Sequence, residues 1–296
     1  YKKLKDLYEK LLEELTFKLN KIHSVNHSSR YWRILIGPWL GYFIQILYDK
    51  WFMLKQTIEQ TEVKNCKVIN RNVLSVVPND MGHFIKMIND DWWHEAIYGQ
   101  LLETYWNKEI ATEKIMLKGR TKHITSTIRG QIKVSLKKWA ERTISFYNKS
   151  VSMRNDYFFI SSYLSLKSDF ILQIRLGQLP KYWRTVQPKI VKPDLLERQW
   201  SLEDNEKKVT MFETVLRKMI PIHIPAVYLE GYKELVMTVN NNWPKNPKAI
   251  FTSNNYETDD YFKVWTAGKT QSGTPLIIGQ HGGHFGMTPF SFHEEH

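Results

Sequence analysis

The chain has 296 residues, of which 42% are hydrophobic and 14% aromatic, enough to bury the core of one large domain or two modest ones. Lysine and arginine outnumber aspartate and glutamate by 42 to 30, and the formal net charge of +12 favours phosphate-bearing partners or an anionic membrane face. A single cysteine, Cys66, excludes an intrachain disulfide framework and a cysteine-rich zinc site. It is typical of a reducing compartment, so we expect a cytoplasmic protein, with peripheral contact at the inner face of the cytoplasmic membrane left open.

Two helices are expected in the first 60 residues. Apolar residues recur every three or four positions over residues 4–22, which predicts an amphipathic helix, and residues 31–58 predict a second, more buried one. The most apolar part of the second helix, residues 34–48, is shorter than the roughly 20 residues that cross a bilayer. A helix of the core is therefore favoured over a membrane-embedded segment, and we expect residues 1–60 to form a helical segment packed on the core.

Strands and helices are predicted to alternate through the rest of the chain. In chain order, the periodicity and the turn residues predict a strand at 67–80, a helix at 83–106, a strand at 156–165, a helix at 166–183, a loop at 185–208, a helix at 210–218, a strand near 227 and a helix after 231. The segment 115–143 is strongly basic, which indicates a solvated helix face or a surface that contacts phosphate.

The clearest unit is the last. A strand at 249–253, a helix at 256–273 and a strand at 274–280 together span about 32 residues, the size of a βαβ crossover, which joins two parallel strands. With the alternation upstream, this unit predicts an α/β fold with a Rossmann-like parallel sheet flanked by helices over residues 61–296, and a helical N-terminal portion.

The carboxyl ends of the predicted strands indicate one polar cleft. In open parallel sheets, ligands bind beyond these ends, where loops converge. Three loops follow such strands, at 161–165, 253–258 and 279–286, and a fourth at 78–83 is expected to join them. Small polar side chains there would suit a hydroxyl-rich ligand, and the candidate binding residues are Asn79, Asp80, Ser161, Ser162, Ser253, Asn254, Asn255, Glu257, Gln280, Gly282 and Gly283.

His281 and His284 are the candidate catalytic bases in the last of these loops. With an ordinary pKa near 6.5, an imidazole can take a proton at neutral pH, as attack by a sugar hydroxyl requires. The neighbouring glycines let the backbone approach a ligand, and their amides can bind phosphate oxygens. The local sequence equally allows two ordinary histidines in a glycine-rich turn. Asp80 and Glu257 are further candidate bases, for which a helix cap or a first-turn charge is the favoured role.

A metal site is not expected. His293 and His296 flank two glutamates, but this run lacks the i, i+4 spacing that places two histidines on one face of a helix. A Rossmann oxidoreductase is also discounted, because the GxGxxG fingerprint of a dinucleotide-binding fold does not follow a first strand, and no cofactor is expected. The aromatic pair Trp92-Trp93 is expected in the core rather than as a platform for a sugar.

Three runs give the chain a resemblance to a known family. The runs LNKIHSVNHSSRYWRILIGPWLGYFIQILYDKW at 19–51, NDDWWHEAIYGQLLE at 89–103 and GTPLIIGQHGGHFGMTPFSFHEEH at 273–296 resemble bacterial transferases encoded in O-antigen and surface-carbohydrate clusters. The resemblance covers essentially the whole chain. It implies the N-terminal, acceptor-side half of a GT-B-like glycosyltransferase, as an excerpt of a longer chain whose second domain would bind the nucleotide-sugar donor.

The last run is also similar, more loosely, to the His-Gly segments of teichoic-acid glycerophosphotransferases, in which a histidine of the first domain serves as base. That similarity assigns the base to His281, with His284 as the substitute. The implied function is transfer of a sugar from an activated nucleotide donor to a saccharide or lipid-linked acceptor, in the biosynthesis of lipopolysaccharide O-antigen or another surface polysaccharide.

The alternative is a non-enzymatic basic module that binds polyanions, either an anionic membrane surface or nucleic acid. The nucleic-acid version is disfavoured, because the sequence contains no zinc finger, basic heptad array or Arg-Gly-aromatic sheet motif. Nucleic acid is therefore not expected among the partners.

Overall fold

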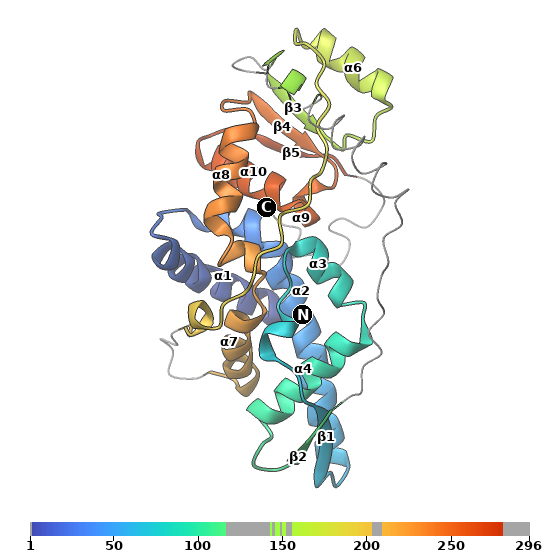
Figure 1. The fold of residues 1–296 in the computed structure, drawn as a ribbon, viewed down its shortest axis with the longest axis vertical. Helices are drawn as coiled ribbons and strands as arrows, with labels where there is room; N and C mark the ends of the chain where they lie inside the picture. The colour runs from blue at the N-terminus through green and yellow to red at the C-terminus, as the bar shows by residue number, and fades with distance from the viewer. Residues whose placement is uncertain are drawn as a thin grey trace.

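The computed structural model describes residues 2–116, 143, 146–148, 150–151, 156–202 and 209–280. One small parallel sheet lies toward each end of the long axis of the molecule, with most of the helices between them (Figure 1). The described helices are α1 (Lys2–His23), α2 (Ser29–Gln60), α3 (Met81–Met87), α4 (Asp91–Thr104), α6 (Leu166–Arg175), α7 (Met211–His223), α8 (Tyr232–Asn242), α9 (Asn255–Thr258) and α10 (Asp260–Gln271). The described strands are β1 (Asn65–Ile69), β2 (Ala111–Ile115), β3 (Tyr157–Ile160), β4 (Ala249–Thr252) and β5 (Leu276–Ile278).

Helices α1 and α2 confirm the two helices predicted at 4–22 and 31–58. The apolar positions of α1 form one buried stripe that packs on α2, as the spacing of three and four requires. The side chain of Ser28 accepts a hydrogen bond from the Tyr31 amide (3.3 Å) and so caps the start of α2. Helix α2 then continues through Pro38 to Gln60.

Helix α2 is a central helix of the core. Most of its residues between Ile34 and Leu47 are buried, and it packs against α1 on one side and α10 on another. The prediction that residues 34–48 belong to a core helix is confirmed. In the part of the chain that the structure describes, no helix combines the length and the apolar character that crossing a membrane would need.

The described strands form two sheets rather than the single sheet that was predicted. β1 pairs with β2 in parallel, and β3, β4 and β5 form a second, fully parallel sheet in that order. The physical reason lies in burial. Val68 is the one buried residue of the β1–β2 pair, whereas β3 and β4 alternate between half-buried and buried residues. The β1–β2 pair therefore lacks the broad apolar face that a larger sheet buries.

Further predictions of elements were inaccurate, and the strand expected at 67–80 ends at Ile69, before a 3₁₀ turn at Val73–Val76. The helix expected at 83–106 is two helices, α3 and α4, because Asp80 and Asp90 each cap a new helix start by accepting a hydrogen bond from a backbone amide of the first turn. The strand expected near 227 is wrong. Residues Ala226–Tyr228 form a 3₁₀ turn, whose first two amides donate to the carbonyl oxygens of Pro78 and Asn79, both at 2.9 Å.

The last βαβ unit is confirmed. β4 leads through α9 and α10 to β5, which lies beside β4 in parallel, with Thr252 opposite Ile278. Gly273 follows α10 at a φ of 91°, a left-handed conformation that glycine adopts without steric cost. The α/β class is thus established for the described residues.

Candidate functional site

The carboxyl ends of β3, β4 and β5 share one edge, as the sequence predicted. The Ser253 amide donates to the carbonyl oxygen of Ser161 (3.2 Å), and the Gly279 amide donates to the carbonyl oxygen of Thr252 (2.8 Å). The three loops that follow the strands therefore start side by side. This edge, defined by residues 161–165, 253–258 and 279–280, is called the strand-end site below.

The loop after β3 has an unusual backbone. Ser161 and Tyr163 adopt left-handed conformations with φ of 48° and 59°, which cost energy for residues other than glycine. Between them, the Ser162 hydroxyl donates to Asp169 at the start of α6 (3.2 Å). The Tyr163 hydroxyl accepts a hydrogen bond from the Asn254 side chain (3.1 Å), which links the loops after β3 and β4. Neither Tyr163 nor Asp169 was predicted from the sequence to be a residue of the site.

The loop after β4 rests on a buried polar network. The Asn255 side-chain amide donates to Asp259 (2.7 Å) and to the Thr185 hydroxyl (2.8 Å), and its backbone amide donates to the Thr252 hydroxyl (3.1 Å). Ser253 and Asn255 are both almost fully buried, so they shape the loop from beneath. Asn254 is half-buried and is thus better placed to meet a ligand.

Asp259 is the titratable group of this network. It caps α10 by accepting from the Phe262 amide (3.0 Å), and only 1% of it is exposed. Burial raises its pKa to about 6, because a charged carboxylate loses hydration there, although the hydrogen bonds from Phe262 and Asn255 favour the charged form. The acidic pair in the first turn of the predicted helix was visible in the sequence, but the burial of Asp259 was not.

Glu257 and Gln280 lie at the open side of the strand-end site. Glu257 is half-buried and accepts a hydrogen bond from the Tyr42 hydroxyl of α2 (2.8 Å), while Gln280 is exposed. Gly279, between β5 and Gln280, has no room for a side chain. A Cβ atom there would lie 2.9 Å from the Ser253 hydroxyl oxygen. The edge is therefore closely packed behind its exposed rim.

Asn79 and Asp80 have roles in the fold. Asp80 accepts from the His83 amide (2.7 Å) as the cap of α3, and Asn79 accepts from the Val191 amide (2.7 Å) through its side-chain oxygen. Their loop still approaches the sheet edge, because the next amide, that of Met81, donates to Asp260 at the start of α10 (3.0 Å). Helix α3 also contacts α9.

The remaining candidates lie outside the described residues. These are His281, Gly282, Gly283 and His284, together with His293 and His296. Gln280, the residue before His281, ends the described part of the chain at the strand-end site. Within the described ranges, no three histidine, cysteine, aspartate or glutamate side chains are grouped as a metal ion would need.

The described fold and edge define an α/β protein in which parallel strands present hydroxyl, carboxamide and carboxyl groups at their carboxyl ends. The chain belongs to the LIC12162 family of transferases, whose family model matches residues 1–296. Searches of curated proteins and of solved structures each returned no significant match. The family confirms the prediction of a transferase.

Proposed function

We propose that this transferase is glycosyltransferase-like and that its acceptor-side domain has the GT-B type of Rossmann fold, with residues 1–60 as a helical segment on an α/β domain of residues 61–296. The observation that carries the proposal is the common edge of β3, β4 and β5, where the 253–258 loop lies next to the strand that leads directly to His281. Parallel α/β sheets bind their ligands at such an edge.

In the proposed mechanism, a saccharide or lipid-linked acceptor docks against Asn254, Glu257 and Gln280, whose side chains can bind sugar hydroxyls. His281 removes the proton from the attacking hydroxyl, whose oxygen bonds to the anomeric carbon of the donor sugar while the bond to the nucleotide phosphate breaks and the nucleotide leaves; His284 is the substitute base. The amides of Gly282 and Gly283 bind phosphate oxygens, and the positive charge of the chain attracts the phosphate groups of the nucleotide-sugar donor. The pathway is the biosynthesis of O-antigen or another surface polysaccharide, at the cytoplasmic side of the membrane.

The test is His281→Ala in the full-length protein, assayed for sugar transfer from a panel of nucleotide sugars. Because a positioned base contributes roughly 10²- to 10⁴-fold, we expect a loss of at least about 100-fold in kcat. Near-normal turnover would remove His281 as the base.

The matched control is His27→Ala. The His27 ring stacks on Tyr31 (3.7 Å between centroids) and forms a hydrogen bond with Gln271 at the last turn of α10 (3.1 Å). That turn lies toward the amino ends of the strands, since β5 starts just after it. Loss of a histidine there should leave kcat unchanged.

The basic module that binds polyanions makes a different prediction. It requires binding to anionic vesicles that weakens steeply with salt and does not depend on a sugar. The transferase proposal instead requires stabilisation of the protein by a specific nucleotide sugar or acceptor, measured as a rise in Tm at constant ionic strength.

A further inference from the structure

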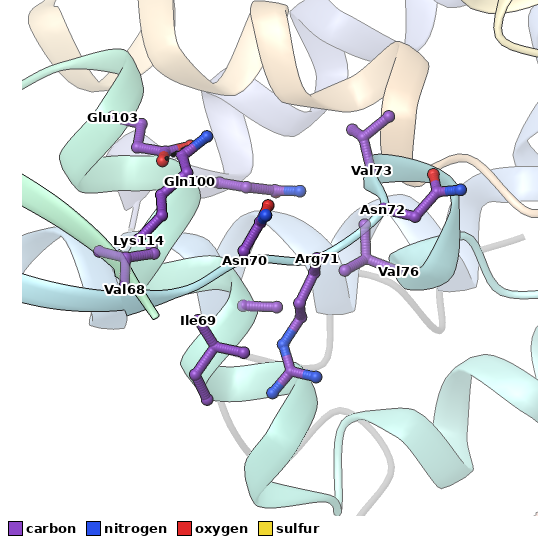
Figure 2. Close-up of a pocket in the computed structure, with 12 residues that line it drawn as sticks. Val68, Ile69, Asn70, Arg71, Asn72, Val73, Val76, Gln100, Glu103 and Lys114 are labelled. Carbon is purple, nitrogen blue, oxygen red and sulfur yellow. Dashed lines mark ion pairs between the residues drawn. The ribbon is translucent and has the colours of Figure 1, made fainter. Parts of the chain in front are cut away.

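A cavity of ≈ 100 Å³ lies at the carboxyl end of the β1–β2 pair, against α4 (Figure 2). It is called the β1 cavity below. The β1–β2 pair and the three-stranded sheet lie toward opposite ends of the molecule, so the β1 cavity is separate from the strand-end site (Figure 1). It nevertheless occupies the equivalent place, beyond the ends of parallel strands, where ligands of such sheets bind.

Two carboxamides line the β1 cavity. Asn70 follows β1, and its NH₂ group contacts the sulfur of Met116 (3.7 Å). Gln100 belongs to α4, and in the view of Figure 2 the ends of the two side chains lie near each other. The Gln100 side-chain oxygen lies 2.7 Å from Nε2 of His223. Because an amide oxygen only accepts, the buried ring of His223 donates to it through Nε2. Gln100 therefore presents its NH₂ group to the β1 cavity.

The charged side chains of the lining are paired within the protein. Lys114 and Glu103 form an ion pair of 3.1 Å at the rim. Arg71 forms an ion pair with Glu95 (2.9 Å), and in Figure 2 it points away from Gln100. The wall between these groups is apolar and is formed by Val68, Val73, Val76 and Ala96. An anion would have to displace one of these ion pairs, whereas a neutral ligand would not.

We propose that the β1 cavity binds a single neutral, hydroxyl-rich ring of the size of a monosaccharide. Hydroxyl groups both donate and accept, which matches the carboxamides of Asn70 and Gln100, and the C–H face of the ring matches the valine wall. A cavity that holds one water molecule has a volume of roughly 10–15 Å³, so the ≈ 100 Å³ of the β1 cavity corresponds to several water molecules or to one sugar ring. The described lining contains no aromatic side chain for stacking, so the affinity is on the order of millimolar.

The test uses the full-length protein and a panel of glucose, galactose, mannose and N-acetylglucosamine, with glucuronate and inorganic phosphate as anionic probes. Binding is detected by saturation-transfer NMR and quantified by titration. Binding of at least one neutral sugar is expected. If no neutral sugar binds, or if only the anions bind, the proposal is overturned.

Two variants locate the binding. Asn70→Ala removes an exposed carboxamide, and Gln100→Glu keeps an oxygen for His223 while it replaces the NH₂ group. Each should weaken sugar binding roughly three- to tenfold, the value of about one hydrogen bond. Asn242→Ala, which removes an exposed carboxamide at the end of α8, should leave it unchanged.

A sugar whose affinity survives both Asn70→Ala and Gln100→Glu binds elsewhere, which overturns the proposal. The inference does not depend on the proposed function. Normal turnover of His281→Ala would reject the catalytic base and leave sugar binding at the β1 cavity intact. Failure of sugars to bind at the β1 cavity would likewise leave the proposed role of His281 intact.

Discussion

Asp260 and Lys263 form an ion pair of 3.0 Å in which both side chains are completely buried. They lie one turn apart at the start of α10, and Lys263 also donates to the Tyr228 hydroxyl (2.6 Å). Asp260 accepts from the Tyr228 hydroxyl and from the Met81 amide, so it joins α10 to α3 and to the 3₁₀ turn at 226–228. Burial and the charge of Asp260 together hold the pKa of Tyr228 well above its ordinary value.

Lys263→Met should destabilise the protein strongly. The substitution leaves the Asp260 carboxylate buried without its cation, and breaking such a pair costs about 3–5 kcal/mol. The free energy of unfolding, from urea denaturation at pH 7.5, measures the loss. The double variant Asp260→Asn with Lys263→Met should recover part of it, because the uncompensated charge is gone.

The exposed pair of Lys64 and Glu62 (3.0 Å) supplies the control for this experiment. Both side chains are more than three-quarters exposed, so solvent screens the pair and Lys64→Met should change the free energy of unfolding little. Equal losses for Lys64→Met and Lys263→Met would contradict the role assigned to the buried pair.

Asp259 should make the protein less stable as the pH rises. Its pKa is about 6 in the folded state and near 3.9 in an unfolded chain, so the folded state retains a proton between pH 4 and 6 that the unfolded state releases. The stability that this group contributes is complete below pH 4 and is lost as the pH rises through 6. Asp259→Asn removes the titration. Between pH 4 and 7, the variant should gain up to roughly 3 kcal/mol relative to the wild type.

His223 should have the opposite effect. Burial, reinforced by the positive charge of Arg198, lowers its pKa to about 3, below the ordinary value of 6.5. Its contribution to stability is present above pH 6.5 and is lost as the pH falls toward 3, because the unfolded state takes up a proton first. His223→Phe keeps a ring against Phe43 and Trp93 and should be less acid-sensitive by roughly 3 kcal/mol between pH 6.5 and 4.

Asp259→Asn and His223→Phe are controls for each other when the free energy of unfolding of both variants is measured by denaturation over the same pH range. Asp259→Asn should reduce the loss of stability toward high pH, and His223→Phe should reduce the loss toward low pH. A difference from the wild type that stays constant across the pH range would contradict the assigned pKa for that residue. At pH 7.5, His223→Phe should also lose about 1–3 kcal/mol, because the Gln100 oxygen is left without its donor.

The sequence carried enough information to predict the last βαβ unit and the core helix α2. In both, apolar spacing and flanking glycine or polar residues agree with the final burial. β2 was not predicted, because Ala111–Ile115 has no buried side chain and forms through backbone pairing with β1. The β-branched run before Tyr228 was misassigned to a strand, because its apolar side chains are buried in a 3₁₀ turn that hydrogen-bonds to the 78–79 loop.

The candidate site, too, was predicted only in part from the sequence. Because parallel strands end at one edge, the sequence could place Asn254 and Gln280 together. It could not indicate that Ser253 and Asn255 would be buried beneath that edge, or that Asp259 would titrate near neutral pH. These properties arise from contacts between residues that are far apart in the chain, and the local periodicity of the sequence does not show such contacts.

Gly279→Ala should disturb the strand-end site directly. The added Cβ atom would lie 2.7 Å from Cζ of Phe251 and 2.9 Å from the Ser253 hydroxyl, so β4 and its loop must shift. We expect a loss of about 1–3 kcal/mol in the free energy of unfolding and, if the proposed function holds, a lower kcat under conditions where the variant is folded. Gly268→Ala is the matched control. It lies inside α10 with no neighbouring atom within 4 Å, and it should raise stability by about 0.5–1 kcal/mol and leave kcat unchanged. Wild-type turnover by folded Gly279→Ala would place the reaction away from this edge.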